Sequence, residues 1–263
     1  MHLAPGITIT MTIMTMGTIM TTIMADAALP LPPRHGPACP GHDGGLETSA
    51  IGLLRLLTWL SPAFPTGAFA YSHGLEWAVE TQDIRDGETL LAWLTAVIAH
   101  GSARTDTILL RHAHRAANDP LELRTISALA VATAASRERR DESLAQGRAF
   151  LRSAAGWGVP DLPEDTPYAI AVGAMAGAHG IDEASTAGAF LQTFASNLIS
   201  AAVRMVPLGQ TTGLQTLAAL EPTILATAAA TRTATLDDLG GCAFRSDLAA
   251  MRHETQYTRL FRS

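Results

Sequence analysis

The stretch from Asp182 to Met205 restricts the fold of this chain more than any other part of the sequence. Its apolar residues return every three or four positions, which places them along one side of an α-helix, and they are Leu191, Phe194, Leu198, Ala202 and Met205. Pro207 follows and predicts the end of the helix, because proline breaks the hydrogen-bond ladder. A stripe of this length has to be covered by other elements, so the segment predicts the central helix of a core.

The remainder of the chain from Ser49 onward also favours helices over strands. Aromatic residues make up only 5% of the chain, and Val and Ile are scattered rather than alternating. Asp119-Pro120-Leu121-Glu122 combines an N-cap, a proline at the first helical position and a glutamate at N3, which predicts a helix start with a capping box. Thr166-Pro167 repeats the cap-plus-proline signature. Further helices are expected from Ser49 to the Ser61-Pro62 stop and at 75–79, 88–100, 103–117, 168–179, 212–219, 223–232 and 247–252. We predict an all-α fold, a single-domain bundle of about ten helices over residues 49–252.

Residues 1–48 predict a disordered extension. Residues 7–24 alternate Met, Thr and Ile without a preceding Lys or Arg, unlike a secretory signal, and they are too polar to span a membrane comfortably. A Pro/Gly-rich stretch follows, which argues against regular structure. Within it, His35, Cys39 and His42 stand close enough in sequence to bind nickel or zinc, while solvated linker side chains are the commoner outcome.

The charge of the chain indicates which class of molecule it binds, and its cysteine content indicates its location. The 18 basic residues are all Arg, and the formal net charge is −6, so no basic stripe is available to neutralise the phosphates of a nucleic acid or an anionic membrane. Cys39 and Cys242 cannot build a disulfide framework, which favours a cytoplasmic location. Other proteins are therefore the expected partners.

Signatures of catalysis are missing from the sequence. The motifs GxxxxGKS, GxGxxG, GxSxG and HExxH do not occur, and the first is impossible in a chain without Lys. His112 and His114 lie about 200° apart around a helix and cannot chelate one ion together. His253 and Glu254 have no nucleophile or second carboxylate beside them in sequence. We expect a non-catalytic protein without a cofactor.

Two internal segments have the composition of binding surfaces. The run from Ser136 to Glu142 puts Glu138 and Glu142 on one helix face and pairs Arg137 with Asp141, which fits either a solvated face or a recognition surface. The loop SPAFPTGAFAYSHGLE, residues 61–76, contains two prolines that restrain the backbone and three large aromatic residues. It either caps the core or forms a preorganised binding edge.

The last eleven residues, 253–263, predict a docking tail. They are polar, yet they include Tyr257, Leu260 and Phe261, which cannot bury much surface by themselves. Arg259 and Arg262 are suited to bidentate contacts with carboxylates. Such a segment is expected to become ordered on a partner.

Four segments together resemble the urease accessory protein family UreF, from about residue 51 to the end of the chain. They are the loop and helix from Ser61 to Glu76, the charged helix from Ser136 to Gly147, the helix end VRMVPLGQ at 203–210, and the terminus HETQYTRLFRS. The combination of PLGQ with HExQxxRLFRS is the specific part. The sequence departs from the family at Thr66-Gly67-Ala68-Phe69-Ala70 and at Ala145-Gln146-Gly147.

This resemblance implies an all-α urease maturation factor that forms a homodimer, binds the accessory protein UreD (also called UreH) and recruits or modulates the GTPase UreG for nickel insertion into apo-urease. It implies that the tail docks on UreD and that the region from Pro62 to Glu76 helps to form the dimer or the GTPase platform. The partner-binding candidates are Pro62, Phe64, Pro65, Gly67, Phe69, Tyr71, Ser72, Gly74, Glu76, Arg137, Glu138, Arg140, Glu142, Arg204, Pro207, Gly209, Gln210, His253, Glu254, Tyr257, Arg259, Leu260, Phe261, Arg262 and Ser263.

A different class of function stays open beside this one. An all-α enzyme or small-ligand binder unrelated to urease would use a cavity between the helices. It would need polar groups that converge on core faces, and the central helix offers few beyond Gln192 and Asn197.

Overall fold

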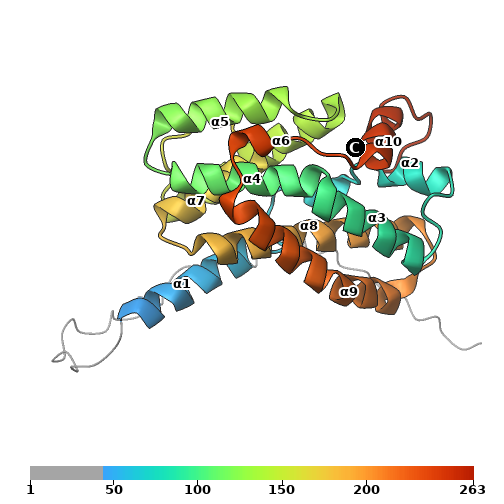
Figure 1. The fold of residues 1–263 in the computed structure, drawn as a ribbon, viewed down its shortest axis with the longest axis horizontal. Helices are drawn as coiled ribbons and strands as arrows, with labels where there is room; N and C mark the ends of the chain where they lie inside the picture. The colour runs from blue at the N-terminus through green and yellow to red at the C-terminus, as the bar shows by residue number, and fades with distance from the viewer. Residues whose placement is uncertain (1–43) are drawn as a thin grey trace, which may run out of the picture. The chain divides into compact units, whose positions relative to one another are not determined.

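The computed structural model describes residues 44–263, which belong to one compact helical unit (Figure 1). None of these residues lies in a strand, which confirms the predicted all-α class. No helix in this range has the length and hydrophobicity needed to cross a membrane. The ten α-helices are α1 (Gly44–Trp59), α2 (Leu75–Glu80), α3 (Gly87–His100), α4 (Ser102–Arg115), α5 (Pro120–Ala132), α6 (Arg137–Ser153), α7 (Tyr168–Ala178), α8 (Glu183–Met205), α9 (Gly209–Ala230) and α10 (Phe244–His253).

The start of the helical unit differs from the predicted boundary. Helix α1 begins at Gly44, five residues before the expected start at Ser49. The other expectations for the extension, including a metal site at His35, Cys39 and His42, concern residues outside the described range.

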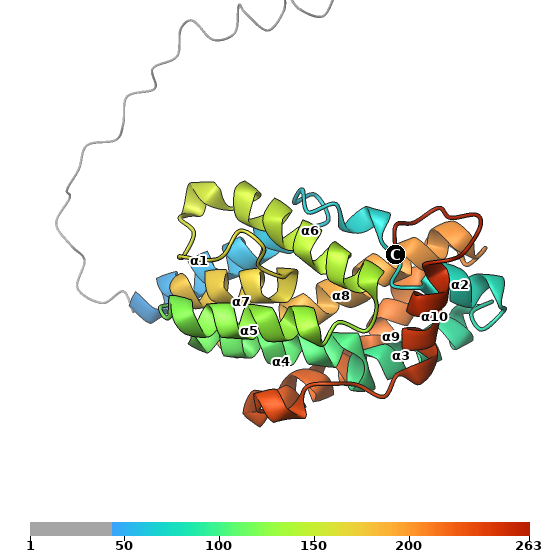
Figure 2. The ribbon, with the colours of Figure 1, turned by 90° about the horizontal axis from the view of Figure 1, so that it is seen from above.

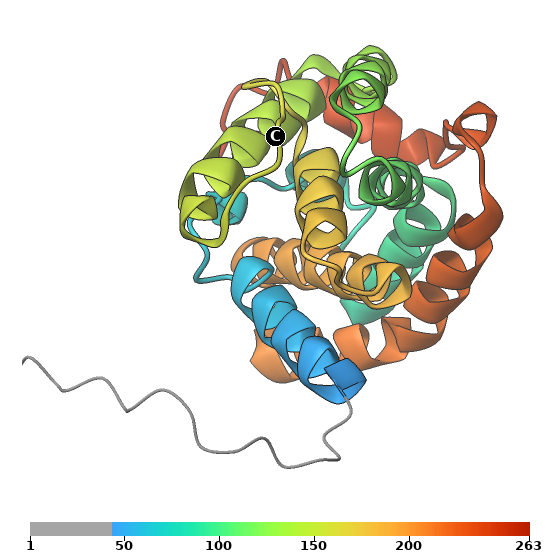
Figure 3. The same ribbon diagram turned by 90° about the vertical axis from the view of Figure 1, so that its left-hand side faces the viewer.

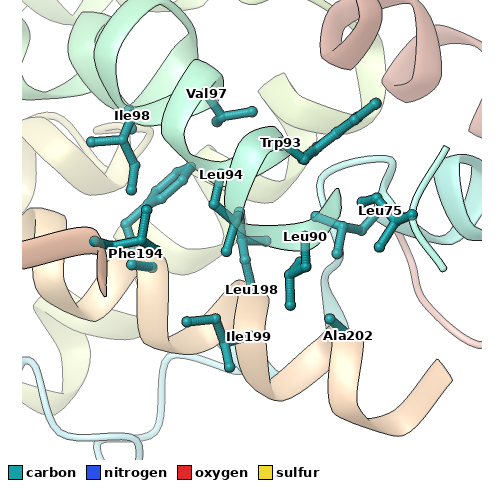
Figure 4. Packing of buried hydrophobic residues seen from close by; sticks show 14 of the residues in the cluster. Leu75, Leu90, Trp93, Leu94, Val97, Ile98, Phe194, Leu198, Ile199 and Ala202 are labelled. Carbon is teal, nitrogen blue, oxygen red and sulfur yellow. The ribbon is translucent and has the colours of Figure 1, made fainter. Parts of the chain in front are cut away.

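Helix α8 is the central core helix that the sequence predicts. Asp182 caps it by accepting a hydrogen bond from the Ser185 N–H. Phe194 and Leu198 are buried and pack against α3 and α2, where Figure 4 shows them beside Leu90 and Leu94. Helix α9 packs against both α3 and α8 and closes the same core (Figure 1). The predicted apolar stripe therefore lies buried at the centre of the bundle.

Helices α4 and α7 form the second close contact of the fold. A Cβ at Gly173 would clash with the Leu110 carbonyl oxygen, and one at Gly177 would clash with the His114 carbonyl oxygen. The two backbones can approach this closely only because α7 carries glycines on the facing side. The small residues of this predicted helix are therefore used for close packing, as expected.

Of the two N-caps that the sequence predicts, Asp119 caps its helix and Thr166 does not. Asp119 caps α5 by accepting from the Leu121 and Glu122 N–H groups at 3.1 Å each, but its own N–H donates to Ala116, so the reciprocal half of the capping box is not formed. The predicted cap at Thr166 is wrong, because its hydroxyl donates to the Pro163 carbonyl.

The two helices predicted at 212–219 and 223–232 are one continuous helix, α9, with Pro222 inside it. Thr216, Leu220 and Ile224 are buried on one face across the proline position. Burial of that continuous face outweighs the loss of one backbone hydrogen bond at Pro222.

The α4–α7 contact yields a test of the packing. Gly173→Ala should destabilise the protein by about 1–3 kcal/mol, because the added methyl meets backbone atoms that cannot move aside. Gly188→Ala in α8 is the matched control: a Cβ there meets no described atom within 4 Å, so greater helix propensity should stabilise by up to about 1 kcal/mol. Urea unfolding followed by circular dichroism measures both. Equal effects of the two substitutions would contradict the close approach.

Candidate partner-binding site

The Glu76 side chain in α2 binds the backbone of the C-terminal tail. Its carboxylate is almost fully buried and accepts hydrogen bonds from the Leu260 N–H at 2.7 Å and the Phe261 N–H at 3.0 Å. The His253 ring adds a third contact at 3.3 Å. A buried carboxylate is costly unless donors replace its water, and here the tail backbone supplies them.

His253, the last residue of α10, joins two of the sequence segments. Its fully buried ring lies between Glu76 and Glu138, with Nδ1 2.6 Å from Glu138 Oε2. Glu138 also accepts from Arg259 Nη1 at 2.6 Å. Next to it, the Glu254 carboxylate accepts from the Arg137 N–H at 2.8 Å, at the start of α6. Acidic groups at a helix N-terminus are favoured by its dipole, so α10 is attached to the first turn of α6.

Glu142 forms the second buried acceptor, one turn further along α6. It accepts from Arg139 at 2.5 Å, from His73 at 2.7 Å, from Gln146 at 2.8 Å and from the Ser263 hydroxyl at 2.6 Å. Burial alone would raise the pKa of Glu142, but the Arg139 charge and the hydrogen bonds lower it to about 2. Burial, helped by Arg139, lowers the pKa of His73, so a neutral imidazole donates from Nε2.

The chain end lies beside α6 in Figure 2, and further contacts fasten it there. The Ser263 main-chain oxygen accepts from the Ser72 N–H at 2.6 Å and from the Ser72 hydroxyl at 2.5 Å. The Phe261 ring is buried, and the Arg204 guanidinium lies 4.5 Å from its centroid. Arg204 also donates to the Phe69 carbonyl at 2.8 Å. Residues from all four segments that carry the family resemblance thus meet at one place.

The comparisons with known proteins agree on one family. A family model described as UreF matches residues 84–221, more than half of the chain. Three proteins named "Urease accessory protein UreF" are similar over most of their length. The one from Rhodopseudomonas palustris (strain BisB18) is 52% identical over 224 residues, covering 81% of this chain and 93% of the relative. Those from Mesorhizobium japonicum and Xanthobacter autotrophicus are each 49% identical, covering 82% and 87% of this chain and 99% and 100% of the relatives.

The chain belongs to the UreF family.

In this UreF chain the tail differs from the sequence-based expectation in one respect. It was expected to become ordered on a partner, yet residues 254–263 are already folded against their own domain. The carboxylate predicted to pair with Arg259 on a partner is Glu138 of the same chain. Main-chain donors of the tail satisfy buried acceptors that would otherwise be unpaired, and this compensates the cost of ordering it.

The charged segment of α6 also behaves differently from a solvated face. Glu142 is buried, and the expected pairing of Arg137 with Asp141 does not form. Arg137 lies 3.8 Å from Glu254, and Asp141 pairs with Arg140 at 3.2 Å. The α6 face is therefore a receptor for the chain's own C-terminus.

The predicted partner-binding residues separate into three groups by exposure. Buried within the chain are Tyr71, Ser72, Gly74, Glu76, Glu142, His253, Phe261 and Ser263. Half-buried are Phe64, Gly67, Glu138 and Glu254. Exposed are Pro62, Pro65, Phe69, Arg137, Arg140, Arg204, Pro207, Gly209, Gln210, Tyr257, Arg259, Leu260 and Arg262. The first group holds the tail in place, and the exposed group is what another protein can contact.

Sequence reasoning missed three members of this cluster, His73, Arg139 and Asp106. Arg139 lies 3.6 Å from Asp106 of α4, whose pKa burial raises to about 6 against the opposing Arg139 charge. Arg139 stands inside the charged run, so its position was visible in the sequence. Its direction toward Asp106 was not, because the packing of α6 on α7 decides which turn of α6 faces inward.

The interior offers little room for a ligand. Two cavities of about 90 and about 40 Å³ lie around Arg139, and Asn197 lines the smaller one. Sites for drug-sized ligands are typically about 300 Å³ or larger. Two hollows reach this size, one of about 300 Å³ beside Leu151 and Pro163 and one of about 370 Å³ beside Trp93 and Phe244, and both are open at the surface rather than enclosed. Among residues 44–263, no group of three His, Cys, Asp or Glu side chains is arranged to hold a metal ion. His112 and His114 contact different carbonyls, of Ala234 and Ile181.

Replacing Glu142 tests the buried acceptor and its pH dependence. Glu142→Gln leaves Arg139 without its main counter-charge and should lower the free energy of unfolding at pH 7 by about 3 kcal/mol. Folding lowers the pKa of Glu142 from 4.5 to about 2, so its contribution is complete above pH 4.5 and is lost as the pH falls toward 2. Urea unfolding should show a difference between wild type and variant that is present at pH 5 and shrinks as the pH falls below 4.5. Asp141→Asn, exposed on the same helix, is the control, and a difference independent of pH would contradict the assignment.

Replacing Glu76 tests the seat of the tail. The amide of Glu76→Gln places a donor where two backbone N–H groups already donate, so the tail should detach. Hydrogen exchange of the C-terminal peptide should become at least about tenfold faster. Glu80→Gln, on the same helix, loses only one exposed bond to Gln256 and should change exchange by less than about twofold. Unchanged protection in Glu76→Gln would show that the tail is held by other contacts.

Proposed function

We propose that this chain is a non-catalytic urease maturation factor that binds UreD and recruits or modulates the GTPase UreG during nickel insertion into apo-urease. Membership of the UreF family supports the role in urease assembly. Nickel is the cargo of this process, and the chain acts through protein contacts in the cytoplasm. It works as a homodimer within the complex.

The observation that carries the proposal is the way in which the tail presents its side chains. Tyr257 is 102% exposed and Leu260 is 75% exposed, although the backbone of Leu260 is bonded to buried Glu76. An exposed tyrosine is typical of binding hot spots, and the neighbouring leucine adds apolar contact area on a backbone that is held in place. Because the tail is ordered beforehand, a partner does not have to supply its ordering entropy. UreD therefore docks on a prefolded tail.

A second exposed face supports contact with the GTPase. Phe69 is 75% exposed at the tip of the 61–76 loop, and Arg204 ties the backbone of this loop to α8. On α6, Arg137 and Arg140 are exposed, with Arg140 engaged only by its neighbour Asp141 among the described ion pairs. Arginine and aromatic side chains on a rigid support suit recognition of an acidic surface on UreG. The chain has no phosphate-binding loop, so its effect on GTP hydrolysis is exerted through the partner.

The UreD contact can be tested without unfolding the tail. The double variant Tyr257→Ala, Leu260→Ser removes the exposed side chains and keeps every backbone bond to Glu76 and Glu142. It should bind UreD at least about tenfold more weakly in co-purification and calorimetry, while the free energy of unfolding changes by less than about 0.5 kcal/mol. Leu121→Ser, at an equally exposed leucine on α5, is the control.

Wild-type affinity in the double variant would overturn the docking role of the tail. Deletion of 256–263 is the less specific experiment, because it also removes hydrogen-bond donors from buried Glu76 and Glu142. Truncation is therefore expected to lower stability as well as binding.

A further inference from the structure

His253 lies between two buried carboxylates at the end of α10, the helix that packs on α2 at the back of the view in Figure 3. Its ring is fully buried, with Nδ1 2.6 Å from Glu138 Oε2 on α6 and Nε2 3.3 Å from Glu76 Oε2 on α2. The Glu76 and Glu138 side chains are only 10% and 11% exposed. Among the other histidines of residues 44–263, those with a hydrogen bond use one ring nitrogen, as His73 and His114 do. Contact of both ring nitrogens with carboxylates therefore sets His253 apart.

The number of hydrogens on the His253 ring follows from the atoms that it contacts. A neutral imidazole has one N–H and one lone pair, whereas an ionised carboxylate oxygen only accepts hydrogen bonds. A neutral ring would turn its lone pair toward either Glu138 or Glu76, at a distance where two acceptors repel each other. A proton on the Glu76 carboxyl instead would lie between the same two atoms. The geometry therefore requires one proton more than a neutral ring and two ionised carboxylates contain.

The charges around the ring and its place in the helix favour this extra proton. Among the described ion pairs, Glu138 also has Arg259, whereas Glu76 has only His253. A buried carboxylate that loses its counter-charge is strongly destabilising. His253 is the last residue of α10, where the helix dipole favours a cation. The next acid along the chain, Glu254, accepts from the α6 backbone. The ring is therefore the cation that Glu76 requires.

We propose that His253 is a pH-sensitive switch that fastens α10 and the C-terminal tail to α2 and α6. With both nitrogens protonated, the ring donates to one carboxylate on each of these two helices. Loss of one proton turns one of these hydrogen bonds into a repulsion and leaves Glu76, the acceptor for the tail backbone, as a buried charge. Because the attached tail binds the proton more tightly than a detached tail, attachment weakens as the pH rises through the range in which the ring loses it.

The consequence for function concerns the exposed side chains of the tail. Tyr257 and Leu260 are presented on a backbone that Glu76 holds in place. When the proton is lost, these side chains lose their fixed support, and ordering them again becomes a cost of any binding. The switch goes beyond the proposed function, because it acts within this chain and involves no partner.

The first measurement is nitrogen-15 NMR of the full-length chain labelled at histidine, at about pH 7.5, where an exposed histidine is about nine-tenths neutral. His253 is assigned by the signals that are missing from His253→Gln, and circular dichroism verifies that this variant is folded. The ring should give two nearly coincident nitrogen signals, which is the pattern of an imidazolium. Two widely separated signals, the pattern of a neutral ring, would overturn the proposal.

Hydrogen exchange of the C-terminal peptide, corrected for the intrinsic effect of pH, connects the proton to the tail. Protection should fall by at least about tenfold over the pH interval in which the His253 signals change to the neutral pattern. The neighbouring cluster keeps a nearly constant charge above pH 7, since the pKa values of Asp106 and Glu142 are about 6 and about 2 and burial lowers the pKa of His73. A ring that loses its proton while protection stays unchanged would contradict the switch.

Glu138→Gln separates the switch from a merely structural role of the ring. A neutral ring can then donate from Nε2 to Glu76 and accept at Nδ1 from the new amide, so the tail should stay attached with protection that changes by less than about twofold with pH. Glu80→Gln on α2 is the matched control and should keep the wild-type pH dependence, because the carboxylate of Glu80 bonds Gln256 at the surface. Equal pH dependence in Glu138→Gln and wild type would refute the switch. No partner protein is present, so the result is independent of the UreD binding test.

Discussion

Burial of two carboxylates, Glu76 and Glu142, is the constraint on which the C-terminal half of this architecture depends. A carboxylate inside a protein costs several kcal/mol unless charged groups or N–H and O–H donors replace its water. Here the donors come from the tail backbone, from Ser263 and from the neighbouring His73 and Arg139. Tail and bundle therefore stabilise each other, and neither presents its native surface without the other.

This constraint explains how a short polar terminus can be held as a rigid surface element. Polar atoms that are close to the bundle are used internally, and the side chains left exposed include the aromatic Tyr257 and the apolar Leu260. The family motif at the terminus thus contains two kinds of residue. His253, Phe261 and Ser263 hold the segment in place, whereas exposed side chains between them are free to meet another protein. Both kinds are needed for a preorganised surface.

Sequence periodicity predicted the parts of the fold that depend on local spacing. Three such features were predictable because each is set within a few turns of one helix. They are the α8 stripe, the cap at Asp119 and the small residues of α7. Prediction failed where a distant element decided the outcome. Pro222 does not divide α9, because a face buried by α3 and α8 continues across it. Thr166 does not cap α7, because the preceding loop brings the Pro163 carbonyl to its hydroxyl.

The candidate site depends even more than the fold on contacts between segments that are distant in sequence. By itself the sequence determined the helical class, the family resemblance and the four segments that carry it, since these depend on residue type and spacing along the chain. Only the tertiary structure decided that Glu76 and Glu142 are buried acceptors, that the tail binds its own domain, and that His253 lies between two carboxylates. From the sequence alone, a charged residue in a helix is expected to face solvent. Only the packing of the helix shows which charged side chains face inward. The physical reason is that the free energy of a buried charge depends on donors more than a hundred residues away in sequence.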